Sequence, residues 1–418
     1  LFAAEVFDLI FALARGGGLR GALHGLWNTP HLLFGQQLAE WRLQLGRILF
    51  AAGLAAYEIS VVFCNSMARQ NWAWVQGVMS PVLEWLAFLC FGAKILFGTR
   101  YTWRELLAGG ALYFIARWVY FNSQNIWWIG IVVAVLAAKD VPLRRPLQVY
   151  FASGCAAMAV VLALHFAGIV APDLTSERMG ALRGTYGYGH PNTFGGLVFG
   201  LVLAYALLRA QKVRWVDCLL VFAVGVFLLV GPASRSAALC TLALAVGLVF
   251  CRLRTGHSVP RWWPGTCAGM VGLTAAVSYL LPLLVIKVGP WNNDIGPAWL
   301  AKLDSLLTCR ISLTWMAYRL LDVKIAGQVF NWPTVDNSFA FALFQFGPVV
   351  AALLGILFSA ALWGHAKQGR RVEVCCLFAM LAYAYMEVQP FHLTTNPTAL
   401  LLCGAVFAQT SARWQKIE

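Results

Sequence analysis

The sequence predicts an all-α membrane protein that crosses the bilayer about twelve times. Of its 418 residues, 60% are hydrophobic and only 11% are charged, whereas a soluble domain carries about a quarter charged residues. Apolar segments recur from about residue 45 to about residue 412, with no Ser- or Pro-rich linker between them. Lipid must therefore be the solvent for most of the chain, and we expect one membrane domain.

The expected spans define the domain organisation. They lie near 45–64, 80–97, 104–118, 125–138, 148–170, 191–209, 216–231, 236–251, 265–286, 339–363, 374–390 and 397–412. Several are shorter than the ~20 residues that an upright helix needs. Residues 1–44 form a cytoplasmic or interfacial segment, because the apolar stretch 1–14 is too short to span. Residues 45–412 form the membrane domain, and 413–418 a cytoplasmic tail.

The distribution of Lys and Arg predicts the orientation. With both termini in the cytoplasm, most basic residues fall on the inner side, as the positive-inside rule requires. The net charge of +14 is then a topology signal, and nucleic-acid binding is not expected. The remaining cations lie outside, in the loop 171–190, the turn 231–236 and the long loop 287–338. An outward-facing binding site is implied, and helical periodicity in the long loop predicts short helices there.

The eleven cysteines predict no metal site. They form no CxxC pair and no Cys/His cluster with zinc-like spacing, and most lie within apolar runs. We interpret them as small core residues. No metal and no cofactor is expected.

Three arginines lie in polar motifs on the predicted outer side. Arg183 belongs to LRGTYGYGHPNTFGG, Arg235 to GPASRSAAL and Arg310 to LLTCRISLTW. Guanidinium groups are permanently charged and can grip phosphate oxygens in pairs, so the three could clamp a diphosphate. Two structural interpretations stay open: His190 could merely cap the helix that Pro191 begins, and Arg235 could snorkel to lipid headgroups.

Two further motifs carry carboxylates. Asp336 lies in VDNSFAFALFQFG at the mouth of a span, where it could accept a proton from a sugar hydroxyl. Helix capping by Asp336 or Asn337 is the alternative. The segment MEVQPFHLTTNP holds Glu387, His392 and Asn396 at membrane depth. Polar groups there are functional by default, although an interhelical hydrogen bond would also explain Asn396.

The order and spacing of these motifs resemble the O-antigen polymerase and O-antigen ligase superfamily. The resemblance covers roughly residues 170–400. The stretch RGTYGYGHPNTFG is similar to the HPN segment of polysaccharide polymerases, and GPASRSA to the Ser-Arg turn of the superfamily. TCRISLTW resembles its arginine-containing helix, and VDNSFAFALFQFG its (H/D)NSY segment.

The resemblance implies an inverting, metal-independent glycosyltransferase of the bacterial cytoplasmic membrane, with its active site facing the periplasm. The donor is a glycan linked to undecaprenyl diphosphate, and the acceptor is a glycan or glycolipid. Membrane lipids and other polysaccharide-assembly proteins are the remaining expected partners. Arg183, Arg235 and Arg310 would bind the diphosphate, and Asp336, His190 or Glu387 would act as the base. The side chains assigned to substrate binding are Asn192, Arg319, Asn337, Ser338, His392 and Asn396.

Other functions stay open. Ligases of the superfamily place a His where this chain has Asp336, which favours the polymerase branch over transfer to lipid A-core. A transporter or flippase of lipid-linked sugars would carry charges within spans of both halves, and we expect the first half to be nearly bare of them.

Overall fold

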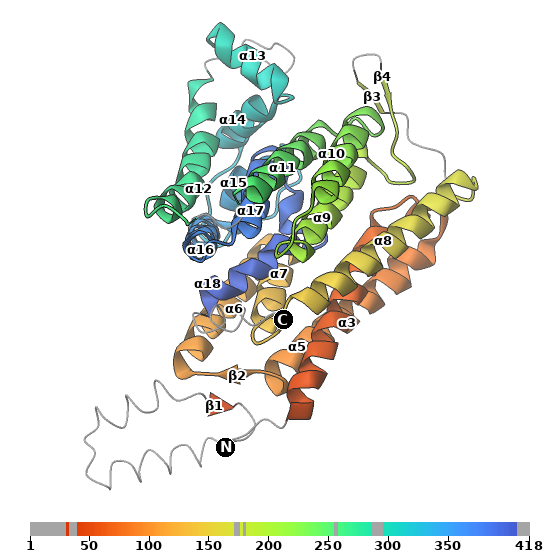
Figure 1. Cartoon of the computed structure of the whole chain (residues 1–418). Coiled ribbons are helices and arrows are strands. Elements are labelled where there is room, and N and C mark those ends of the chain that lie inside the picture. Colours follow the sequence, from red (N-terminus) through yellow and green to blue (C-terminus); the bar gives the residue numbers. More distant parts are fainter. Residues whose placement is uncertain are drawn as a thin grey trace, which may run out of the picture.

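The computed structural model describes residues 31–32, 40–170, 176–178, 181–254, 258–285 and 296–407. This part of the chain is helical apart from two small antiparallel ribbons (Figure 1). In one, β1 (His31–Leu32) pairs with β2 (Arg100–Tyr101), and in the other β3 (Ser176–Arg178) pairs with β4 (Ala181–Arg183). The predicted interfacial stretch 1–14 and the tail 413–418 lie outside the described residues.

The first half of the described chain packs around a short central helix. Its helices are α3 (Glu40–Cys64), α4 (Ala68–Asn71), the π-helix η1 (Val75–Met79), α5 (Ser80–Phe97), α6 (Trp103–Ser123), α7 (Ile126–Ala137) and α8 (Arg144–Phe166). Thr102 begins α6 through a capping box with Glu105. Helix α7 is apolar on all sides and largely buried, with α5 and α6 packed against it.

The second half carries the predicted motifs. Its helices are α9 (Pro191–Leu208), α10 (Trp215–Val230), α11 (Arg235–Leu253), α12 (Trp263–Leu280), η2 (Leu281–Leu284), α13 (Ala298–Leu306), α14 (Arg310–Leu320), α15 (Ser338–Phe341), the π-helix η3 (Ala342–Phe346), α16 (Pro348–Lys367), α17 (Arg371–Met386), η4 (Gln389–Phe391), η5 (Pro397–Leu402) and α18 (Cys403–Val406). The loop 287–338 therefore contains short helices, as its periodicity predicts.

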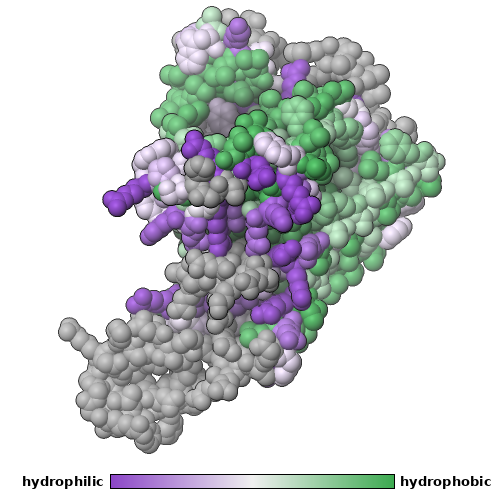
Figure 2. All heavy atoms as spheres, in the orientation of Figure 1, coloured by the Kyte–Doolittle hydropathy of each residue, from purple (hydrophilic) through white to green (hydrophobic). Residues whose placement is uncertain are grey.

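Seven of the described helical segments are long and apolar enough to cross a membrane. They are Trp41–Cys64, Val75–Phe97, Arg144–Phe166, Pro191–Leu208, Arg235–Leu253, Trp263–Leu284 and Pro348–Lys367. Figure 2 shows hydrophobic side chains over much of the visible helical surface, with hydrophilic side chains gathered in a band across its lower part. The chain is thus a polytopic membrane protein.

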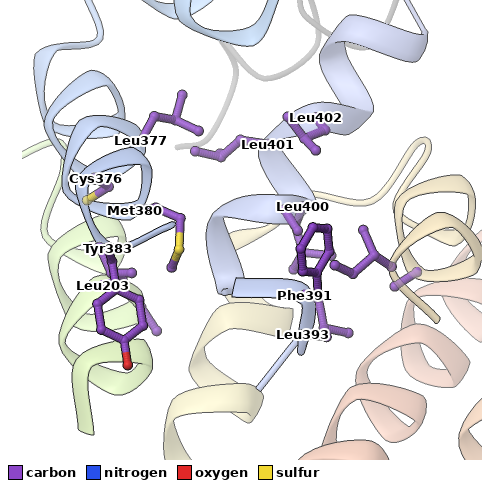
Figure 3. Close-up of a cluster of buried hydrophobic side chains, with 14 of the residues drawn as sticks. Leu203, Cys376, Leu377, Met380, Tyr383, Phe391, Leu393, Leu400, Leu401 and Leu402 are labelled. Atoms are coloured by element: carbon purple, nitrogen blue, oxygen red, sulfur yellow. The ribbon is translucent and has the colours of Figure 1, made fainter. Parts of the chain in front are cut away.

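The predicted count of twelve spans is not confirmed. Helix α7 has 12 residues, which make ~18 Å of helix, well short of a hydrocarbon core of ~30 Å. Helix α10 has 16 residues and α17 also has 16. The segment 397–406 is short as well, and its leucines pack against α17 in the core (Figure 3). Helices enclosed by protein need not match the bilayer thickness, and apolar composition alone does not distinguish them from spans.

Helix α9 comes very close to the chain that follows α17. A Cβ atom at Gly200 would lie 2.6 Å from the carbonyl oxygen of Thr394, and one at Gly196 would lie 1.9 Å from Oε1 of Gln389. Small residues let backbones approach each other in this way. The glycines of the predicted HPN motif therefore bring α9 against the segment 387–396.

The predicted span 339–363 is broken. Helices α15 and η3 end at Gly347, whose φ is 87°, and α16 begins at Pro348. A Cβ atom at Gly347 would lie 2.1 Å from the carbonyl oxygen of Ile325. Only glycine fits this backbone conformation and this close approach, so the break holds α15 as a separate short helix.

At the end of the helix bundle that carries β2, buried charged side chains connect neighbouring loops through hydrogen bonds and ion pairs. Lys94 Nζ donates to Thr99 Oγ1 at 2.7 Å and to the carbonyl of Lys139. Lys139 Nζ lies 3.3 Å from Glu105 Oε1 and 3.2 Å from Asp140 Oδ2. Both connections that contribute, between α5 and α6 and between α7 and α8, are predicted to be cytoplasmic. At the opposite end, the outer motifs meet around Glu387.

Candidate functional site

Glu387 is the centre of the cluster. It follows the last residue of α17 and is only 5% exposed. Its Oε1 atom accepts hydrogen bonds from Ser236 Oγ at 2.7 Å, Asn192 Nδ2 at 3.0 Å and Arg310 Nη2 at 2.5 Å. Its Oε2 atom receives no hydrogen bond from the described residues.

Arg310 is the cation paired with Glu387. It begins α14, is 7% exposed, and also donates to the carbonyls of Leu307 and Met386 and to Thr308 Oγ1. The position of α14 depends on Asp304, whose Oδ1 accepts from the backbone N–H of Ile311 at 2.7 Å. This buried carboxylate satisfies free N–H groups of the helix. This role of Asp304 carries no local sequence signal, because the Asp lies seven residues before the N–H group that it accepts from.

Arg183 is the second buried cation of the site. It ends β4 and is 6% exposed. Its Nη2 donates to Asn192 Oδ1 at 2.9 Å and to the carbonyl of Ala233 at 3.2 Å. Asn192 therefore bridges Arg183 and Glu387 through its two amide atoms. The motif LRGTYGYGHPNTFGG, which holds both Arg183 and Asn192, and the Ser-Arg turn therefore meet here.

The (H/D)NSY-like segment also contacts the backbone around Glu387. Ser338 Oγ donates to the carbonyl of Glu387 at 2.5 Å. Asn337 Nδ2 donates to the carbonyl of Tyr385 at 3.1 Å, while its Oδ1 caps α15 at the N–H groups of Phe339 and Ala340. Both side chains hold the end of α17 in position. The capping alternative is thus correct for Asn337.

Two proposed catalytic or phosphate-binding groups are exposed and have no hydrogen bond to Glu387. His190 is exposed, and its Nδ1 accepts from the N–H of Asn192 at 3.1 Å, so it caps α9. Arg235 is exposed at the start of α11 and makes no hydrogen bond or ion pair with described residues, although Ser236 beside it reaches Glu387. Their functional assignments stay predictions.

Asp336 lies immediately before the capping Asn337 and is half-buried. It contributes to the electrostatics of Glu387: burial raises the pKa of the Glu387 carboxyl, the negative charge of Asp336 adds to the rise, and Arg310 and Ser236 oppose it. A carboxyl with a raised pKa beside two buried arginines is typical of functional sites.

The other predicted substrate-binding residues have structural partners. Arg319 is exposed on α14, with its guanidinium 5.7 Å from the centre of the Trp315 ring. The rings of His392 and Trp127 lie 4.1 Å apart. Asn396 caps η5 through the N–H of Ala399 and donates to the carbonyl of Pro390. Asn396 therefore connects η4 to the start of η5 within its own segment.

The expectation that first-half spans are nearly bare of charge is wrong. Glu58 is 2% exposed in α3, Lys94 is 1% exposed in α5, and Glu105 is 8% exposed in α6. Glu84 in α5 is half-buried and bonded to Ser60. These groups are single charges within long apolar runs, which gives them little weight in a sequence pattern.

Within the described ranges, no group of three or more His, Cys, Asp or Glu side chains could hold a metal ion. Comparisons with protein families, with curated proteins and with solved structures found no match to this chain.

Proposed function

We propose that the chain is a membrane glycosyltransferase that polymerises oligosaccharide repeat units carried on undecaprenyl diphosphate. One observation supports it above the others: side chains from four sequence motifs gather around Glu387, where buried Arg310 contacts the carboxylate directly and buried Arg183 is linked to it through Asn192. Two buried guanidinium groups can each donate paired hydrogen bonds to phosphate oxygens, which supports a diphosphate as the ligand.

The proposed reaction begins with an exchange of partners. The donor diphosphate competes with Glu387 for Arg310, and Arg183 adds a second guanidinium. Bidentate contacts to phosphate oxygens then stabilise the negative charge that develops on the departing diphosphate. Loss of Arg310 as a partner leaves Glu387 buried and more basic.

Glu387 is the base that the geometry favours. Its Oε2 has no hydrogen-bond partner among the described residues, while Oε1 is held by Asn192 and Ser236. The acceptor hydroxyl donates its proton to Oε2 as its oxygen attacks the anomeric carbon from the face opposite the diphosphate. The C–O bond to the diphosphate breaks and the configuration is inverted. Asp336 is the alternative base.

The experiment is transfer by the purified full-length chain in detergent. The substrate is lipid-linked repeat units extracted from a strain that lacks the gene. We expect a ladder of longer lipid-linked glycans on a gel. Single repeats that stay unextended, together with full-length chains left on the lipid in the deletion strain, would identify a ligase instead.

A transporter of lipid-linked sugars is a second candidate, favoured by the buried charges Glu58, Lys94 and Glu105 in first-half helices. The purified chain in vesicles distinguishes the two. Movement of labelled lipid-linked sugar across the bilayer without growth of the glycan would support transport and contradict the glycosyltransferase proposal.

A further inference from the structure

A long apolar groove lies between α5 and α6, with α7 as its floor. Its volume is about 650 Å³, within the ~300–1,000 Å³ range of sites for small ligands. Phe88 and Ile95 of α5, Leu106 of α6 and Val133 of α7 line it. Gly92 and Gly110 face each other's helices there, and a Cβ atom at either would meet nothing within 4 Å.

Polar side chains line both ends of the groove. At the β2 end, Tyr101 and Glu105 line it, next to the buried Lys139. At the other end it is lined by Glu84 and Arg117. Glu84 lies 13 residues before the end of α5, and Arg117 lies 14 residues after the start of α6. The two therefore stand ~20 and ~21 Å above the turn that connects the helices.

Glu84 and Arg117 are thus oppositely charged side chains at the same height along the groove. Arg117 is exposed and stacks over the Phe121 ring at 4.2 Å, and it has no ion pair among the described residues. Glu84 has one contact, from Ser60 at 3.4 Å. The aromatic side chains Tyr113 and Tyr120 also line this end.

We propose that this groove binds one acyl chain of a zwitterionic glycerophospholipid with a primary ammonium group. The phosphate contacts Arg117 and the ammonium contacts Glu84, while the chain lies over Gly92 and Gly110. This site is independent of the glycosyltransferase proposal, since none of its residues belongs to the Glu387 cluster.

The length of the groove limits how long a lipid chain it can hold. Glu84 and Leu96 are both lining residues, and the twelve residues from one to the other span ~18 Å of helix. This length is close to one leaflet, about half of a ~30 Å hydrocarbon core. An acyl chain of ordinary length fills it, whereas a long isoprenoid would extend far beyond it.

The test uses the full chain, purified in mild detergent, with its retained lipid identified by mass spectrometry. Gly92→Leu and Gly110→Leu fill the groove from opposite walls without a clash, and each should remove the retained phospholipid. Gly269→Leu is the matched control, because Gly269 is exposed on α12, where a Cβ atom also meets nothing within 4 Å. This variant should keep the lipid.

The headgroup is tested on delipidated protein. Dioleoylphosphatidylethanolamine should bind to wild type more tightly than dioleoylphosphatidylglycerol, and Arg117→Gln should weaken it roughly tenfold or more. Equal binding of the two lipids would contradict the role of Glu84. Retention of an isoprenoid lipid, or equal phospholipid in wild type and both filled variants, would overturn the proposal.

Discussion

At the residue scale, the pairing of Arg310 with Glu387 determines what substitutions will do. Each side chain is nearly inaccessible, and the two are 77 positions apart in the chain. Removing one partner of a buried ion pair leaves an uncompensated charge, which commonly costs ~3–5 kcal/mol. Stability and activity must therefore be measured separately here.

Arg310→Ala should lower both stability and transfer. We expect the apparent free energy of unfolding to fall by about 3 kcal/mol, because Glu387 loses its cation. The double variant Arg310→Ala/Glu387→Gln should recover most of that stability and no activity. Thermal unfolding in detergent and the gel assay check the two effects. If the single variant unfolds like wild type, the ion pair is not formed in solution.

Glu387→Gln should abolish transfer and should also lower the apparent free energy of unfolding by about 3 kcal/mol, because Arg310 loses its anion. Gln keeps the size of Glu and can still accept from Ser236, but it cannot take up a proton. Asp336→Asn is the matched control on the second carboxylate and should retain most activity. An inactive Asp336→Asn beside an active Glu387→Gln would reverse the assignment of the base.

The pH dependence of transfer follows from the same carboxyl. Burial, together with Asp336, raises the pKa of Glu387 above its ordinary value, against Arg310 and Ser236. The basic form is present above that pKa, so activity should fall as pH decreases through it, at a higher pH than for an ordinary glutamate. Transfer rates measured from pH 4 to pH 8 test whether activity falls in this direction. A rate that rises toward acid would contradict Glu387 as the base.

At the scale of elements, the break at Gly347 separates α15 from α16. Sequence periodicity predicts one span through 339–363, since α15, η3 and α16 are all apolar. The interruption depends on the close approach of Ile325 from the preceding loop. With α15 set apart, Asn337 and Ser338 can face the end of α17.

Gly347→Ala should destabilise the protein by roughly 1–3 kcal/mol, because alanine at φ 87° is strained and its Cβ overlaps a backbone oxygen. Gly355→Ala, within α16 and with open space around its Cβ, should be neutral or slightly stabilising. Thermal unfolding compares them. Equal stability of the two variants would show that α15 and α16 can join.

At the scale of the whole molecule, the loops sort into two ends. Lys94 joins loops at one end, and Arg371 also donates to the carbonyl of Arg254 in another predicted cytoplasmic loop. Arg183, Ser236 and Arg310 join loops at the end that carries Glu387. The orientation of these ends relative to the membrane stays a prediction from the positive-inside rule.

Labelling of Cys309 tests the orientation. Cys309 is exposed in the loop predicted to lie outside, so an impermeant maleimide should modify it in intact cells. The control is Lys212→Cys in a Cys309→Ser background, at an exposed position of a predicted inner loop. It should react only after permeabilisation. The reverse pattern would place the Glu387 cluster in the cytoplasm.

The sequence by itself determined that this is a polytopic helical membrane protein and which polar segments meet at one end. Composition and the distribution of charges are properties of the chain alone, and only lipid is a good solvent for so many apolar side chains. The remaining features of the fold and of the candidate site depend on tertiary structure. It shortened or enclosed several predicted spans, buried Glu58 and Lys94 in the first half, and left Arg235 and His190 exposed. It also paired Arg310 with Glu387, because such a contact depends on how helices distant in the chain pack together, which no local pattern encodes.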